Sequence, residues 1–267
     1  MIFYKTDDEV ELMRTSALLV SATLTEVAKV LKPGMTTMDI DKLANEFIND
    51  NNAIPSFFNY GGFPYHICTS VNDVVVHGFP NQVALREGDI VSVDVGVIKD
   101  GFHGDHAYTF ILGETSPEII KLVKTTKDSL FEGIKYAIAG NRLGEISNAI
   151  QQYNEKQGYG VVRDLVGHGL GRSMHEDPQV PNFGKKNGGI EMKKNLVLAI
   201  EPMVNMGTYK VTTDSDGWVV RTADRLPSVH FEHDVCVKAD VALILSDYAP
   251  IEKAEKANSN LNSSYYS

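Results

Sequence analysis

Cysteines, basic residues and long apolar runs are all scarce in this 267-residue chain. Cys68 and Cys236 are too few for a disulfide framework and too far apart in sequence for a zinc knuckle, which favours a reducing compartment. The apolar runs are far shorter than the roughly 20 residues of a membrane span. The N-terminus, MIFYKTDDEVELM, lacks the basic start and apolar core of a signal peptide. We therefore expect a cytoplasmic protein without membrane contact.

The formal net charge of -10 argues against sequence-independent binding to nucleic acid, which depends on many lysine and arginine contacts to phosphate. Two local basic pairs, Lys185–Lys186 and Lys193–Lys194, are typical of solvated surface, and a ribosome contact through them is only a hypothesis. Because 43% of the residues are hydrophobic, the chain can bury a sizeable core.

Acidic residues interrupt segments that otherwise have strand composition. Between Arg86 and Leu112, Asp94 lies among valines and isoleucines, although aspartate is depleted in strands. A tight turn at Asp100–Gly101 would place Asp94 opposite Ala107 and diagonal to Asp105, with both carboxylates on one face. One such aspartate is often solvated or paired with an arginine. Two close carboxylates in an apolar sheet repel each other unless a cation lies between them, so the hairpin predicts half of a metal site.

Helical periodicity in the first half predicts a long helix and then a shorter one. Thr6 and Glu9 form a capping box before a helix that ends at Pro33–Gly34, and Thr36 and Asp39 begin the next.

The same order of elements repeats from Ser116–Pro117, with a long helix to Gly140 and a shorter one to Gly158. We therefore predict an α+β fold of two helix-helix-sheet halves related by a pseudo-twofold, about residues 1–113 and 114–250. We expect the strands at the centre and the helices outside, in a single domain of residues 1–250. Residues 251–267 are polar and predict a flexible tail.

The second half supplies further candidate ligands. Glu201 interrupts the strand segment VLAIEPMV, and Glu232 lies in SVHFEHDVCV, predicted as one strand with His230 and Asp234 on the same face. His168 is surrounded by glycines, which permit close backbone approach, although such a histidine is also common in ordinary loops. Together with the hairpin, four carboxylates and one imidazole suit two divalent ions, which could be Mn, Fe, Co or Zn.

Six ordered motifs make the sequence resemble the type I methionine aminopeptidases, a branch of the pita-bread (creatinase/aminopeptidase) metallopeptidases. The motifs are VVHG at His77, SVDVG at Asp94, DGFHGDHAYTF at Asp105, GHGLGRSMHEDPQV at His168 and His175, AIEPMV at Glu201 and HFEHDVCV at Glu232. The resemblance extends from about residue 2 to residue 246. It implies the pita-bread fold, with a central antiparallel curved sheet and outer helices, and makes residues 1–250 a catalytic domain. It also implies removal of the initiator methionine from peptides and nascent chains with a small second residue.

The resemblance also implies a role for each motif residue. Asp94 chelates one metal, Asp105 and Glu232 bridge both ions, and His168 and Glu201 complete the other site. A metal-activated water attacks the carbonyl carbon, and Glu201 transfers its proton.

By the same resemblance, His175 stabilises the developing oxyanion and His77 contacts the scissile amide nitrogen. The implied pocket for the methionine side chain consists of Tyr60, Phe63, Cys68, Met174 and Trp218.

Two positions depart from the pattern of that branch. Met174 replaces the usual aromatic residue, which leaves the shape of the pocket open. His106 replaces a small or hydroxyl residue but should point away from the metals by strand alternation. The alternatives are a proline-specific relative, such as aminopeptidase P or prolidase, and a metal-free binding module of the same fold. We expect a monomer.

Overall fold

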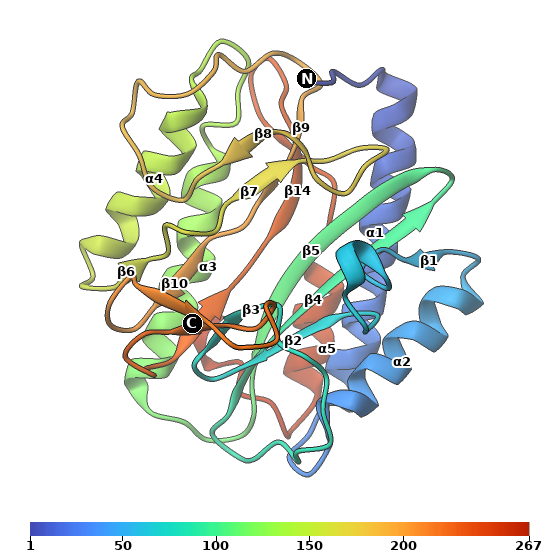
Figure 1. Ribbon diagram of the computed structural model, residues 1–267, viewed down its shortest axis with the longest axis vertical. Helices are drawn as coiled ribbons and strands as arrows, with labels where there is room; N and C mark the ends of the chain where they lie inside the picture. The colour runs from blue at the N-terminus through green and yellow to red at the C-terminus, as the bar shows by residue number, and fades with distance from the viewer. Residues whose placement is uncertain (267) are drawn as a thin grey trace.

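Helices lie outside and antiparallel strands lie between them in the computed structural model, which describes residues 1–266 (Figure 1). The helical elements are α1 (Asp7–Val30), α2 (Thr37–Asp50), α3 (Pro117–Ile134), α4 (Leu143–Glu155), α5 (Ala249–Ala257) and the short 3-10 turns η1 (Tyr60–Gly62) and η2 (Ser264–Tyr266). Helix α1 packs against α2 and α5, whereas α3 packs against α4. The predicted order of a long helix and then a shorter one in each half is confirmed.

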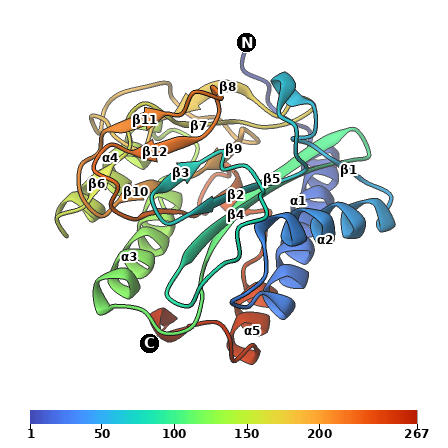
Figure 2. The same cartoon turned by 60° about the horizontal axis from the view of Figure 1, so that its bottom comes forward.

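The strands divide between the two halves in the same way. The first half contains β1 (Ile54–Pro55), β2 (Cys68–Val71), β3 (Val74–Val76), β4 (Ile90–Lys99) and β5 (Phe102–Ile111). The second half contains β6 (Gly160–Val161), β7 (Gly167–Gly169), β8 (Glu176–Val180), β9 (Val197–Ile200), β10 (Met203–Asn205), β11 (Val211–Thr213), β12 (Val220–Thr222), β13 (Ser228–His230), β14 (His233–Cys236) and β15 (Leu243–Ile244). Figure 2 shows β2, β4 and β5 between the α1–α2 side and the α3–α4 side. This arrangement is the predicted α+β class.

Side-chain caps define the starts of α1, α2 and α3. Thr6 and Thr36 form the expected capping boxes with Glu9 and Asp39, and Ser116 caps α3. The sequence predicts a helix that continues to Gly140, but α3 ends at Ile134. The N–H groups of residues 139 and 140 instead donate to the carbonyl oxygens of residues 238 and 192, so tertiary hydrogen bonds replace the last helical turn.

The β4–β5 hairpin has the predicted register. Lys99 pairs with Phe102 across the turn, and Asp94 pairs with Ala107. On its other edge, β4 pairs with β2, and Cys68 lies opposite Asp94. Helix α1 covers β5 so closely that a Cβ at Gly104 would lie 2.4 Å from a backbone nitrogen of the helix. The hairpin is therefore a rigid support for its aspartates.

The segment Ser228–Val237 is not one strand, contrary to the prediction. Strand β13 ends at His230 and β14 begins at His233, so Phe231 and Glu232 lie in a break between them. The N–H of Glu232 donates to the carbonyl oxygen of Ala107 on β5 at 3.1 Å, while the Phe231 ring is fully buried. The break thus joins the second half of the chain to the hairpin of the first.

The prediction of a flexible tail after Pro250 is wrong for the described part of that segment. Helix α5 buries Ile251 and Glu255 completely, and Tyr265 is 2% exposed. The Tyr265 hydroxyl donates to the Glu255 carboxylate at 2.9 Å and pairs with the Tyr108 hydroxyl of β5 at 2.9 Å. Ser267, the last residue of the predicted tail, lies outside the described residues. Within residues 1–266, no helix combines the length and the apolar character needed to cross a membrane.

Candidate functional site

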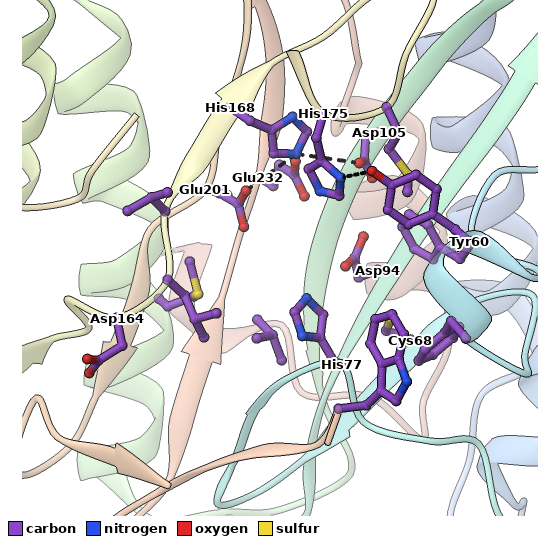
Figure 3. Close-up of a pocket in the computed structure, with 18 residues that line it drawn as sticks. Tyr60, Cys68, His77, Asp94, Asp105, Asp164, His168, His175, Glu201 and Glu232 are labelled. Atoms are coloured by element: carbon purple, nitrogen blue, oxygen red, sulfur yellow. Dashed lines mark hydrogen bonds and ion pairs between the residues drawn. The ribbon is translucent and has the colours of Figure 1, made fainter. Parts of the chain in front are cut away.

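A cavity of about 270 Å³ collects side chains from both halves of the chain (Figure 3). Every residue that the sequence assigned to the site lines it: Tyr60, Phe63, Cys68, His77, Asp94, Asp105, His168, Met174, His175, Glu201, Glu232 and Trp218. Figure 3 shows the carboxylates of Asp94, Glu201 and Glu232 between Cys68 and His77 on one side and His168 and His175 on the other.

The candidate metal ligands reach this cavity from five different strands or strand breaks. Asp94 and Asp105 come from β4 and β5, His168 from β7, and Glu201 and Glu232 from the breaks that follow β9 and β13. His168 Nε2 lies 3.9 Å from Asp105 Oδ2 and 3.7 Å from Glu201 Oε1. Ligand atoms of Asp105, His168 and Glu232 all lie within 4.8 Å of one another.

His230 also belongs to this cluster, although it was given no role from the sequence. Its Nε2 lies 3.4 Å from Glu201 Oε2 and 4.0 Å from Glu232 Oε2. The backbone carbonyl of His230 accepts a hydrogen bond from the Thr109 hydroxyl at 2.6 Å, which fixes this residue to β5. Its position two residues before Glu232 on one strand face was the available signal.

The donor set fits divalent metal ions. Among the described residues, Asp94 Oδ1, Asp105 Oδ1, Glu232 Oε1 and His230 Nε2 are buried without a hydrogen-bond partner. Burial raises the pKa of Asp94 to about 6 and that of Glu201 to about 8. Burial and the neighbouring carboxylates also raise the pKa values of Asp105 and Glu232. Buried oxygens without partners and carboxyls that resist ionisation both indicate a missing positive charge.

Two histidines flank the carboxylates. His77 follows β3 with a positive φ of 57°, and burial, followed by repulsion from His230 and His175, lowers its pKa to about 4. His175 Nδ1 lies 2.6 Å from the Tyr60 hydroxyl, and its ring centroid is 4.2 Å from that of His168. Burial lowers the pKa of His175 as well. Both rings are therefore neutral near pH 7.

An apolar pocket adjoins the carboxylates. Its buried members are Phe57, Phe63, Cys68 and Met174, and the half-buried rings of Tyr65, Phe79 and Trp218 pack against them. Phe57 was not anticipated from the sequence, because aromatic residues are common in any core. The buried Asp41 carboxylate accepts hydrogen bonds from the N–H groups of His66 and Ile67, and this contact holds the aromatic loop in place.

His106 points away from the cluster, as strand alternation predicts. Its Nε2 lies 2.9 Å from the Ser21 hydroxyl of α1, and its ring packs against His233 and Tyr248. It belongs to the core between β5 and α1.

The profile of metallopeptidase family M24 matches residues 11–239. This chain belongs to that family. Membership implies the use of a divalent metal by a peptidase, in agreement with the cluster of carboxylates and histidines. The methionine aminopeptidase of Clostridium acetobutylicum is 52% identical to the chain over 238 residues, which are 89% of this chain and 95% of that relative.

Solved structures of family members have the same fold. The methionine aminopeptidase of Thermotoga maritima superimposes with a TM-score of 0.91 at 44% identity and covers 92% of this chain and 100% of its own. The methionine aminopeptidase of Rickettsia prowazekii gives 0.91 at 40% identity with the same coverage. The predicted resemblance and pita-bread fold are confirmed.

The proline-specific branch is more distant. An X-Pro aminopeptidase from Thermotoga maritima has a TM-score of 0.70 at 19% identity, and the match covers 91% of this chain but 62% of that one. This likeness concerns the fold alone.

Proposed function

We propose that this protein removes the N-terminal methionine from peptides and nascent proteins whose second residue is small. The observation that carries the proposal is that an apolar pocket and a buried carboxylate–histidine cluster line one cavity. The methionine aminopeptidases of Clostridium acetobutylicum and Thermotoga maritima match this chain over 95% and 100% of their own length, which supports the same activity.

For the metal centre, we propose two divalent ions. Asp94 would hold one, Asp105 and Glu232 would bridge both, and His168 and Glu201 would complete the other. The grouping of Asp105, His168 and Glu232 within 4.8 Å supports this assignment. Bound there, such ions supply Lewis acidity and lower the pKa of a coordinated water molecule. The carboxylate-rich donor set is compatible with Mn, Fe, Co or Zn.

Glu201 would accept and return a proton during hydrolysis. Its carboxylate lies on the cavity wall, with Oε1 3.7 Å from His168 Nε2 and Oε2 3.4 Å from His230 Nε2, so it faces the space where the attacking water would lie. The backbone carbonyl of Glu201 accepts a hydrogen bond from Asn182 Nδ2 at 2.8 Å, which holds the residue in the strand break.

His175 would stabilise the carbonyl oxygen of the scissile bond by donating a hydrogen bond to it as negative charge develops there. Because the ring is neutral and its Nδ1 contacts the Tyr60 hydroxyl, donation by Tyr60 leaves the ring proton on Nε2. His77, on the opposite side of the carboxylates, would contact the amide nitrogen.

The methionine side chain would fill the pocket of Tyr60, Phe63, Cys68, Met174 and Trp218. Aromatic walls and polarizable sulfur suit an unbranched thioether. A free amine of the substrate would lie near the Asp94 carboxylate, which restricts cleavage to N-termini. We further propose a monomeric, cytoplasmic enzyme whose catalytic domain includes the packed segment up to Tyr266, while a ribosome contact stays a hypothesis.

The test is the release of free methionine from Met-Ala-Ser. We expect no release by metal-free protein, and release when Mn, Co, Fe or Zn is restored, with an N-acetylated peptide uncleaved. Met-Ala and Met-Gly peptides should be cut well and Met-Leu and Met-Lys poorly. Alanine at Asp105 or Glu232 should abolish release and leave the fold intact, as checked by circular dichroism.

Two outcomes would favour the alternatives. Cleavage of Xaa-Pro peptides in place of Met-Ala-Ser would indicate the proline-specific branch. Absence of cleavage with every metal would indicate a binding module.

A further inference from the structure

A second depression continues the catalytic cavity past His168 and His175. It shares these two residues and Val166 with the cavity, and none of Phe63, Cys68 and Trp218 of the methionine pocket lines it. Its other walls include Met1 and Phe3 from the N-terminal segment, and Asp177 and Gln179 from β8. We call it the N-terminal groove, defined by Met1, Phe3, His175, Asp177 and Gln179.

The N-terminal wall of this groove is held in place by contacts on both sides. Ile2 forms a parallel bridge with Asp177, and the Lys5 N–H donates to the carbonyl oxygen of Asn195 at 2.9 Å. The Lys5 ammonium lies 2.5 Å from Glu176 Oε2, and both side chains are almost fully buried, at 5% and 7% exposure. An ion pair that is removed from solvent in this way has few alternative geometries. The segment is therefore a fixed wall and not a loose terminus.

The groove presents apolar and acidic groups to solvent. Phe3 is 51% exposed and Met1 is 89% exposed, although both are apolar side chains beside the catalytic cavity. The Asp177 carboxylate pairs with the N-terminal ammonium of Met1, and the two groups are 57% and 86% exposed. An exposed pair of this kind is weak, so a cation of another chain can replace the ammonium.

We propose that the N-terminal groove binds the fourth and fifth residues of the substrate polypeptide and favours a basic side chain at one of them. The inference rests on the proposed peptidase function. With the first side chain in the methionine pocket and the scissile bond beside the carboxylates, the chain continues past His175 into the groove. Phe3 then packs on the peptide, and Asp177 pairs with a lysine or arginine as it now pairs with an ammonium group.

The experiment compares kcat/KM for Met-Ala-Ser, Met-Ala-Ser-Leu-Lys and Met-Ala-Ser-Leu-Glu. In the unaltered, metal-loaded protein we expect the lysine peptide to exceed the glutamate peptide by about threefold or more at low salt, and less at high salt. D177N should remove this difference. F3A should reduce the advantage of both longer peptides over Met-Ala-Ser. Neither change should alter the kcat/KM for Met-Ala-Ser itself, because neither residue belongs to the catalytic cavity.

Two matched controls come from the same end of the chain. Tyr4 is 43% exposed and, although next to Phe3, does not line the groove, and Asp8 is an exposed acid on α1. Y4A and D8N should leave all three peptides unchanged. Equal kcat/KM values for the three peptides would contradict peptide binding in the groove, provided that methionine is still released. Effects of Y4A and D8N as large as those of F3A and D177N would contradict it as well. Absence of release from all three peptides would contradict the peptidase function itself.

Discussion

The hydroxyl of Tyr248 accepts a hydrogen bond from the N–H of Glu232 at 3.0 Å and donates toward the carbonyl oxygen of the same residue at 2.6 Å. It also lies 2.8 Å from the carbonyl oxygen of Ala107 on β5. Tyr248, outside the part of the chain that matches the family profile, therefore fixes the strand break that carries a proposed bridging ligand.

Replacement of Tyr248 by phenylalanine should weaken both the fold and the metal site. Loss of the hydroxyl leaves buried backbone groups with fewer partners, and we expect a loss of about 1–2 kcal/mol in the free energy of unfolding. Because Glu232 would be less firmly held, a higher metal concentration should be needed for half-maximal activity. Urea unfolding and metal titration of activity measure the two effects. Y153F, which removes a half-buried hydroxyl on α4, is the control; an unchanged metal requirement in Y248F would contradict the positioning role.

The metal-free protein should lose stability as the pH rises from about 6.5 to about 8.5. The folded-state pKa of Glu201 is about 8, and those of Asp105 and Glu232 are also raised, whereas carboxyls of an unfolded chain ionise near about pH 4. Between these values the folded protein retains protons that the unfolded chain has lost, so folding becomes less favourable with increasing pH.

Buried histidines change the free energy of unfolding with pH in the opposite direction, but they do so at lower pH. Burial lowers the pKa of His168 to about 3, so its stabilising effect is lost as the pH falls below about 6.5 and is constant above that value. We therefore expect the free energy of unfolding, measured with urea, to fall by at least about 1 kcal/mol between about pH 6.5 and about pH 8.5. Added Mn or Co should remove this decline, and E201Q should reduce it in the metal-free protein. A flat profile without metal would contradict the buried charge cluster.

Local sequence signals were sufficient where the chain itself sets the geometry. The turn at Asp100–Gly101 determines the register of β4 and β5, so the juxtaposition of Asp94 and Asp105 was predictable. The break at Glu232 was not, because its cause lies in contacts with Ala107 and Tyr248, which are distant in sequence. The alternation in Ser228–Val237 predicted that His230 and Glu232 share a face. It gave His230 no role, because its neighbour Glu201 is also distant in sequence.

The hydrogen bond between Tyr60 and His175 predicts a catalytic defect without a loss of stability. Y60F removes the partner of His175 Nδ1, and the neutral ring is then free to carry its proton on either nitrogen. We expect kcat for Met-Ala-Ser to fall by about tenfold. Tyr60 is 41% exposed, so thermal unfolding should be unchanged. Y209F, at a similarly exposed tyrosine beside Arg163, is the control, and full activity of Y60F would show that the tautomer does not matter.

The C-terminal segment provides a test of how far burial overrides a polar sequence. The composition of residues 251–267 suggested a tail, yet the Tyr265 ring is buried and its hydroxyl joins Tyr108 of β5 to the fully buried Glu255. Removal of a large buried aromatic ring leaves a cavity, so Y265A should lower the free energy of unfolding by about 3–5 kcal/mol. Y4A, at an exposed tyrosine, should change it by less than about 0.5 kcal/mol. Urea unfolding of both variants tests whether the segment is packed. A frayed segment would give equally small changes in Y265A and Y4A, whereas a packed segment would give a much larger change in Y265A.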